Sequence, residues 1–138
     1  MDVNTNVCII DDDDIYQLTT SINIKAINPD FKINLFNDGL EAINFIKANL
    51  TNQTELPDII FLDINMPVMD GFQFMEEYVL LKPQLNKPIT IHMVSSSVDP
   101  VDTEKSKLHN EISEYIVKPL KKPKLEEILK CFIDNSNA

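Results

Sequence analysis

The sequence predicts an α/β fold in which five strands form a parallel sheet covered by helices on both faces. Short apolar runs alternate with longer segments of helical pattern, and this alternation repeats along the whole chain. The runs are almost continuously apolar, which is typical of strands buried on both faces of a parallel sheet. Adjacent runs are not joined by two-residue Asn-Gly or Asp-Gly turns, which disfavours antiparallel hairpins.

The predicted strands are the apolar runs themselves. They are Val7–Ile10, Ile33–Phe36, Ile59–Leu62, Ile89–Val94 and Tyr115–Val117. In open parallel sheets, the loops that leave the carboxyl ends of the strands meet at one edge, where ligands bind. The residues directly after each run are therefore the candidates for function.

The first predicted helix follows the first strand and ends at Asn28-Pro29. We expect Asp13 and Asp14 to cap its N-terminal end. Its apolar stripe, which we expect to pack on the sheet, consists of Ile15, Leu18, Ile22 and Ile27.

The second predicted helix starts after a cap at Asn37 or Asp38. The third spans Phe72–Leu81 and the fourth lies around Val101–Leu108. The fifth follows Pro123 and carries the apolar residues Leu125, Ile128, Leu129 and Phe132.

Length and composition predict a single domain over residues 1–138, without an output domain. The formal net charge is -10, with 22 acidic and 12 basic residues, which argues against direct binding of nucleic acid. The chain has neither a signal-peptide pattern nor an apolar run long enough to insert in a membrane. The two distant cysteines, Cys8 and Cys131, fit reduced thiols. We therefore expect a cytoplasmic protein.

Charged and polar residues follow four of the predicted strands. They are Asp11–Asp14, Asp63, Ser95–Ser97 and Lys118-Pro119. Carboxylates gathered at one edge repel one another unless a cation binds among them. Because the available ligands are oxygen atoms, the set predicts Mg²⁺ or Mn²⁺ and not zinc.

With that metal, a carboxylate at the end of a buried strand can attack a phosphorus atom. Asp63 is the best-placed nucleophile. Lys118 and the hydroxyl of Ser95 are placed to hold oxygens of the phosphoryl group. The residues alone thus predict an aspartyl-phosphate site.

Four segments of the chain carry motifs of a known family. These segments are Ile9-Ile10-Asp11-Asp12-Asp13, Phe61-Leu62-Asp63-Ile64-Asn65-Met66-Pro67-Val68-Met69-Asp70-Gly71, Met93-Val94-Ser95-Ser96 and Tyr115-Ile116-Val117-Lys118-Pro119-Leu120. They resemble response-regulator receiver domains, the switch modules of two-component signalling, and the resemblance spans the chain. The resemblance implies a flavodoxin-like doubly wound (βα)5 fold with strand order 2-1-3-4-5. It also implies phosphorelay signal transduction, with phosphotransfer from a sensor histidine kinase or a histidine phosphotransfer protein.

The same resemblance implies roles for individual residues of this chain. Asp63 is the expected phosphoacceptor, and Lys118 before a cis-proline is the expected phosphate-binding lysine. Ser95 and Tyr115 are the expected switch residues. The expected metal ligands are Asp11, Asp12, Asp63 and the backbone carbonyl of Asn65.

We therefore expect a signalling module, not an enzyme, which assists only its own phosphorylation and dephosphorylation. Its expected output is a changed binding surface for a downstream target protein, and phosphorylation-induced dimerisation is left open.

Two other functions use some of the same residues. A Mg²⁺-dependent phosphatase or phosphotransferase with an aspartyl-phosphate intermediate is disfavoured, because Asn65 stands where the Asp-x-Asp pattern of such enzymes needs an aspartate. A phosphorylation-independent binding module has no chemical need for the combination of Asp11, Asp12, Asp63 and Lys118.

Overall fold

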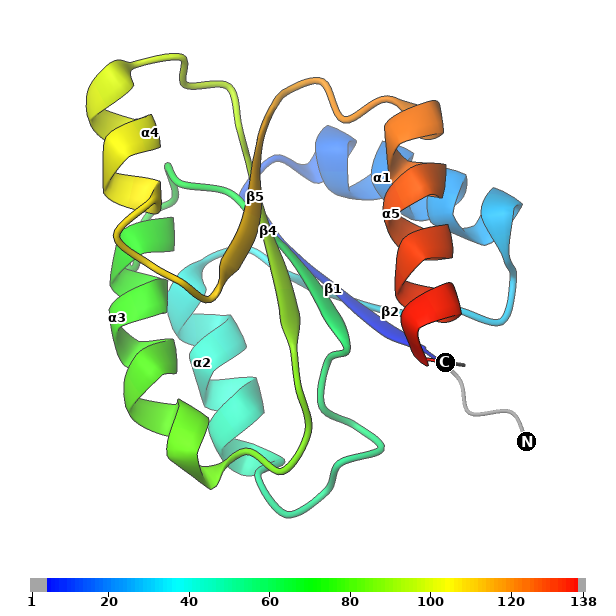
Figure 1. Cartoon of the computed structure of the whole chain (residues 1–138), viewed down its shortest axis with the longest axis horizontal. Helices are drawn as coiled ribbons and strands as arrows, with labels where there is room; N and C mark the ends of the chain where they lie inside the picture. The colour runs from blue at the N-terminus through cyan, green and yellow to red at the C-terminus, as the bar shows by residue number, and fades with distance from the viewer. Residues whose placement is uncertain (1–4, 137–138) are drawn as a thin grey trace.

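The computed structural model describes residues 5–136 and consists of five strands and five α-helices (Figure 1). The strands are β1 (Asn6–Ile10), β2 (Lys32–Phe36), β3 (Ile59–Leu62), β4 (Thr90–Ser95) and β5 (Ile112–Val117). The helices are α1 (Asp14–Ile27), α2 (Gly39–Ala48), α3 (Gly71–Leu81), α4 (Pro100–Ser106) and α5 (Lys122–Ser136), with a 3-10 turn at Lys82–Gln84.

The strands form one parallel sheet in the order β2-β1-β3-β4-β5. This confirms the predicted fold class and strand order. The predicted bounds of β3 are those observed, and those of β1, β2 and β4 differ from the observed bounds by at most one residue. The exception is β5, which begins at Ile112, three residues before the predicted start at Tyr115.

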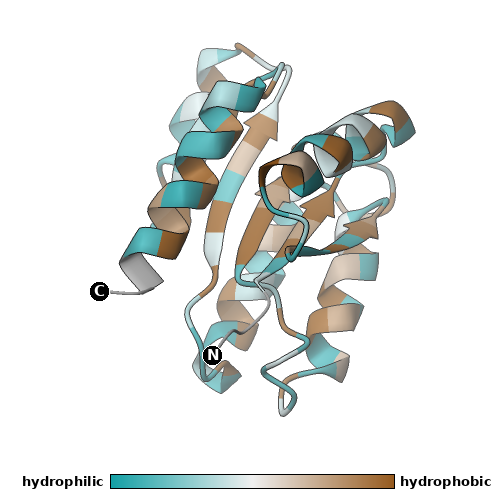
Figure 2. Ribbon diagram, turned by 90° about the vertical axis from the view of Figure 1, so that its right-hand side faces the viewer, coloured by the Kyte–Doolittle hydropathy of each residue, from teal (hydrophilic) through white to brown (hydrophobic). Residues whose placement is uncertain are grey.

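Helices cover both faces of the sheet, with α1 beside α5 on one face and α2 beside α3 on the other (Figure 1). Side chains of β1 alternate between the two faces, as the pleat of a strand requires. Val7 and Ile9 lie in the core beneath α1 and α5, whereas Cys8 and Ile10 lie in the core beneath α2 and α3. Hydrophobic residues accordingly follow the strands in Figure 2.

The pairing of β1 with its two neighbours sets the geometry of the functional edge. Ile10 at the end of β1 is paired with Phe36 of β2 and with Leu62 of β3. The N–H of Asp11 donates to the carbonyl of Phe36 at 3.0 Å, and the N–H of Asp63 donates to the carbonyl of Ile10 at 2.9 Å. Asp11 and Asp63 therefore leave the sheet side by side.

Aspartates cap the helices that start near this edge. Asp13 accepts hydrogen bonds from the first amides of α1, which confirms its predicted role. Of the two residues expected to cap α2, the cap is Asp38 and not Asn37. Asp70 forms a capping box with Gln73 at the start of α3. These caps fix where each helix leaves the functional edge.

The predicted orientation of α1 is wrong. Three members of its expected core stripe face solvent, since the exposed fractions of Ile15, Leu18 and Ile22 are 77%, 61% and 59%. Of the expected stripe, Ile27 is half-buried and packs against the core. The side chains that α1 buries are Gln17, Thr20 and Ile24.

The polar side chain of Gln17 explains this rotation of α1. Its amide nitrogen donates to the carbonyl of Asp11 at 2.6 Å and to the carbonyl of Phe36 at 3.1 Å. Buried polar groups are tolerated where they are hydrogen-bonded, and here they satisfy backbone carbonyls at the end of the sheet. Hydrophobic periodicity alone does not detect such a face.

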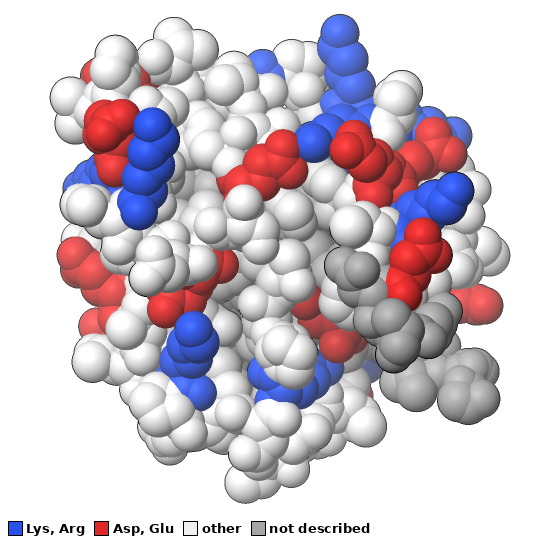
Figure 3. Space-filling model, viewed as in Figure 1, with Lys and Arg blue, Asp and Glu red and all other residues white. Residues whose placement is uncertain are grey.

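The surface carries charges of both signs. Acidic and basic side chains are interspersed over the face shown in Figure 3. Among residues 5–136, no helix combines the length and apolar character needed to cross a bilayer.

Candidate functional site

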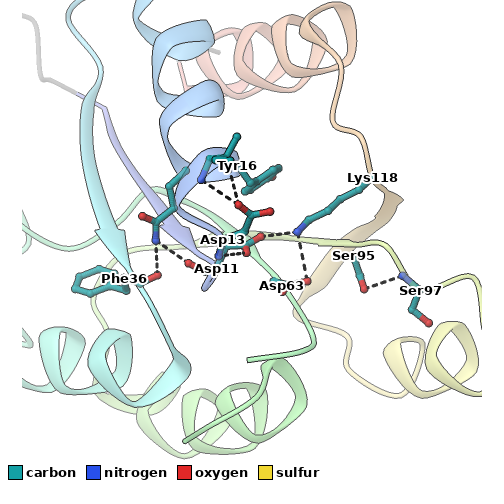
Figure 4. A network of polar contacts seen from close by, with 10 residues as sticks. Asp11, Asp13, Tyr16, Phe36, Asp63, Ser95, Ser97 and Lys118 are labelled. Atoms are coloured by element: carbon teal, nitrogen blue, oxygen red, sulfur yellow. Dashed lines mark hydrogen bonds and ion pairs between the residues drawn. The ribbon is translucent and has the colours of Figure 1, made fainter. Parts of the chain in front are cut away.

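The carboxyl ends of four strands bring the predicted site residues together (Figure 4). Asp11 follows β1, Asp63 follows β3, Ser95 ends β4 and Lys118 follows β5. Each of Asp11, Asp12 and Asp63 offers a carboxylate oxygen within 4.8 Å of the others. The segments after β1 and β3 thus supply one acidic cluster, and the segment after β5 supplies the lysine beside it.

Lys118 bridges the two buried carboxylates. Its Nζ atom lies 2.7 Å from Oδ2 of Asp11 and 3.8 Å from Oδ1 of Asp63. The peptide bond from Lys118 to Pro119 is cis, as expected. The side chain of Lys118 is only 19% exposed, so its ammonium is held near the carboxylates and is not spread over the surface.

The two buried carboxylates are electrostatically strained. The pKa of Asp63 is raised to about 6, chiefly by burial and also by the neighbouring carboxylate of Asp11, while the Lys118 ammonium opposes both effects. Burial also raises the pKa of Asp11, against the hydrogen bond from Lys118. One ammonium therefore does not compensate three carboxylates, and the cluster favours an added cation.

This donor set suits a hard divalent ion. Carboxylate oxygens from Asp11, Asp12 and Asp63 are ligands that Mg²⁺ accepts, and Asp12 is exposed, which leaves an open side for water or a phosphoryl oxygen. Asn65 lies in the exposed loop after β3, and its part as a carbonyl ligand stays a prediction.

Asp11 is held in place by its neighbours. Its Oδ1 atom accepts a hydrogen bond of 2.9 Å from the N–H of Asp13, and its carbonyl accepts from Gln17. Gln17 was missed in the sequence, where it lies between apolar residues of the expected core stripe. No local pattern in the sequence distinguishes it from an exposed polar residue of a helix.

The two predicted switch residues are linked through the loop after β4. Ser95 is fully buried, and its Oγ accepts a hydrogen bond of 3.1 Å from the N–H of Ser97. The hydroxyl of Tyr115 donates to the carbonyl of Ser97 at 2.9 Å. A movement of Ser95 would therefore reach Tyr115 through one intervening residue.

Gly71 approaches the site more closely than any side chain would allow. A Cβ atom at Gly71 would lie 2.3 Å from the carbonyl oxygen of Asp63. The N–H of Gly71 donates to the carbonyl of Ile64 at 2.8 Å, which ties the start of α3 to the chain just after Asp63. The backbone of the proposed acceptor is thus packed directly against α3.

A large cavity lies away from this cluster. It has a volume of about 520 Å³ and is lined by residues of β4, β5 and α5, including His92, Lys124 and Phe132. Its lining does not include Asp63, so it offers no substrate pocket beside the carboxylates.

Comparison with known proteins identifies the family. Residues 7–130 match the family described as response regulator receiver domain. The chain is 32% identical over 93 residues to the sensor histidine kinase CheAY of Helicobacter pylori, which is 67% of this chain and 11% of that protein. It is 22% identical over 136 residues to the two-component response regulator ORR1 of Oryza sativa subsp. indica, which is 97% of this chain and 58% of that protein.

Solved structures show the same fold. A two-component response regulator from Cytophaga hutchinsonii superposes with a TM-score of 0.78 at 27% identity, over 96% of this chain and 99% of that chain. One from Legionella pneumophila has a TM-score of 0.80 at 19% identity, over 95% and 99% of the two chains. The chain spans less than two thirds of the length of the curated relatives that it matches.

The family match covers most of the chain, and the observed strand order is the one that the family resemblance implied. Both agree with the acidic cluster and the lysine that meet at the carboxyl edge of the sheet. The chain therefore belongs to the response regulator receiver domain family.

Proposed function

We propose that this protein is a phosphorylation switch in which Asp63 accepts a phosphoryl group from a phosphohistidine. The observation that carries this proposal is the position of Asp63, buried at the end of β3 with Asp11, Asp12 and Lys118 around its carboxylate. Chain segments that match this protein occur in two proteins named as histidine kinases, which supports a kinase or a phosphotransfer protein as the donor.

In the proposed reaction, an oxygen of Asp63 attacks the phosphorus atom of the donor. A P–O bond forms as the P–N bond to the donor imidazole breaks, and the imidazole nitrogen keeps the bonding electron pair. Asp11, Asp12, Asp63 and the Asn65 carbonyl would hold Mg²⁺, which would supply positive charge that offsets the charge of the phosphoryl oxygens.

The chain's own side chains then hold the product. The Lys118 ammonium, now on Asp11, is within reach of a phosphoryl oxygen on Asp63. The Ser95 hydroxyl, now accepting from the N–H of Ser97, is proposed to turn and donate to another phosphoryl oxygen. Both residues would then interact with negatively charged phosphoryl oxygens, which are absent before the transfer.

The proposed output follows from the bonds around Ser97. Movement of Ser95 toward the phosphoryl group disturbs the contact between Ser97 and the hydroxyl of Tyr115, which joins β5 to the loop before α4. We propose that this shifts the surface of α4, β5 and α5 between two states that a downstream protein distinguishes. We propose that the phosphoryl transfer takes place in the cytoplasm.

Intact-mass analysis with acetyl phosphate tests this proposal. We expect a Mg²⁺-dependent gain of one phosphoryl group that is absent in Asp63→Asn. The exposed Asp30→Asn is the matched control, because it makes the same chemical change away from the site. Equal labelling of Asp63→Asn and the unaltered protein would refute Asp63 as the acceptor, and rapid turnover of a chromogenic phosphate ester would indicate an enzyme.

A further inference from the structure

The ammonium of Lys118 has a second neighbour besides the carboxylates, the aromatic ring of Tyr16. Its Nζ atom lies 4.4 Å from the centre of this ring, within the range of a cation–π interaction. Tyr16 lies in the first turn of α1, one residue removed from the acidic segment (Figure 4). No role was predicted for Tyr16 from the sequence.

Tyr16 and Lys118 are members of a closed circuit of four residues. Lys118 donates to Oδ2 of Asp11 at 2.7 Å, and Oδ1 of Asp11 accepts from the N–H of Asp13 at 2.9 Å. Oδ1 of Asp13 accepts from the N–H of Tyr16 at 3.2 Å, and the ring of Tyr16 returns to Lys118. The position of the ring is thus tied to the cap of α1 and to the acidic cluster.

The ring differs from the other partners of Lys118 in one respect. Asp11 and Asp63 are carboxylates that also interact with a bound cation or a phosphoryl group. Their attraction for the ammonium of Lys118 therefore changes when either of these binds. The ring of Tyr16 carries no charge to share, and its face attracts the ammonium in either state. A lysine on a flexible four-carbon stem would otherwise be free to leave the site for water.

We propose that Tyr16 is a positioning residue that holds the Lys118 ammonium over the site while its carboxylate partners are exchanged for a phosphoryl oxygen. This inference rests on the proposed function. In this proposal Tyr16 takes no part in the bond changes and acts through Lys118.

The alternative is that the ring only fills space, because Tyr16 also packs against the core beneath α1 and α5. Two substitutions separate these roles. Tyr16→Phe keeps the ring face, whereas Tyr16→Leu keeps apolar bulk and loses the face. A space-filling role predicts that Tyr16→Leu lowers the affinity for a phosphoryl group equally with or without Lys118. A positioning role predicts that this loss depends on Lys118 and is absent in Tyr16→Phe.

The test measures the affinity for beryllofluoride, a phosphoryl mimic, at saturating Mg²⁺ by NMR titration. Affinity should stay within about twofold in Tyr16→Phe and fall about three- to tenfold in Tyr16→Leu. The affinity for Mg²⁺ alone should change less than the affinity for beryllofluoride, because the ammonium of Lys118 contacts the phosphoryl mimic and not the cation. In a Lys118→Met background, Tyr16→Leu should have less than a twofold further effect.

Equal loss of affinity from Tyr16→Leu in both backgrounds would overturn the inference and leave the proposed function standing. Failure of the unaltered protein to bind beryllofluoride and to accept a phosphoryl group would overturn the proposed function, and this inference with it. If Tyr16→Leu does not fold, stepwise fluorination of the ring in Tyr16→Phe weakens the ring face while keeping its shape. Affinity that does not fall with fluorination would then overturn the inference.

Discussion

The backbone N–H of Lys118 donates a hydrogen bond of 2.8 Å to the carbonyl oxygen of Ser95. This bond continues the pairing of β4 with β5, in which Ser95 lies opposite Val117. The hydroxyl of Ser95 and the ammonium of Lys118 are therefore delivered by one hydrogen-bonded ladder. The pairing of the two strands sets the distance between these groups. Residues that directly follow paired strands are therefore brought together by the sheet.

Mg²⁺ affinity should fall as the pH is lowered through about 6, the pKa to which burial raises Asp63. A bound ion needs the ionised carboxylate, so protonation competes with the metal and binding should release protons. Calorimetric titration from pH 5 to 8 in two buffers of different ionisation enthalpy measures both effects. Affinity that is constant over this range would show that Asp63 is ionised throughout or is not a ligand.

Asp63→Asn should stabilise the metal-free protein at pH 7. The pKa of Asp63 is raised from 3.8 to about 6, so the folded state binds more protons than the unfolded state between these values. This carboxyl therefore lowers stability as the pH rises through that window, and above it the ionised group is unfavourable. The asparagine removes this cost, which is on the order of 3 kcal/mol.

Urea unfolding in EDTA measures the effect of Asp63→Asn at pH 7 and at pH 4. The gain in the free energy of unfolding should be smaller at pH 4, where the carboxyl of the unaltered protein is largely neutral in the folded state. Asp30→Asn, at an exposed site, should change neither value. A destabilised Asp63→Asn at pH 7 would contradict the account of the site as electrostatically strained.

Gly71→Ala should destabilise the fold and slow phosphorylation of Asp63. The new Cβ atom would lie 2.3 Å from the Asp63 carbonyl oxygen, a backbone atom that cannot rotate away. We expect a loss of about 2–4 kcal/mol, as for other strained or overpacked sites. Gly39→Ala is the comparison, because its Cβ atom would meet atoms of Met69 at 2.9 Å and part of that clash is with a side chain that can move. Equal losses in the two variants would contradict the special closeness of Gly71 to Asp63.

Most of the site was predictable because it is encoded locally. Asp11, Asp63 and Lys118 each stand directly after an apolar strand, and parallel topology then brings strand ends together. Asp11 and Lys118 are 107 residues apart and in contact. Their positions after two parallel strands are enough to place them at the same edge of the sheet.

The orientation of α1 was not predictable in the same way. Hydrophobic spacing selected Ile15, Leu18 and Ile22, whereas Gln17 and Thr20 are buried. The amide of Gln17 is satisfied by backbone carbonyls of two segments that meet only in the folded chain. A polar side chain whose partners are distant in sequence is indistinguishable from a surface residue before the sheet is assembled. Tyr16 was missed for the same reason, since its partner Lys118 is distant in sequence.

The exposed apolar face of α1 suggests where the phosphodonor docks. Ile15, Leu18 and Ile22 lie on α1, which begins at the last aspartate of the acidic segment, and large exposed apolar groups gathered on one face mark interaction surfaces. Replacing all three with glutamine should change the free energy of unfolding by less than about 1 kcal/mol, because these side chains are mostly in water.

The triple glutamine variant should accept phosphate from a histidine kinase or a phosphotransfer protein at least about tenfold more slowly, a loss typical of interface truncation. Its labelling by acetyl phosphate should be unchanged, since a small donor needs no docking surface. Leu80→Gln with Leu108→Gln is the matched control, because these side chains are 70% and 80% exposed on other segments. If the triple variant slows labelling by both donors alike, the face supports the site itself; if it slows neither, the donor docks elsewhere.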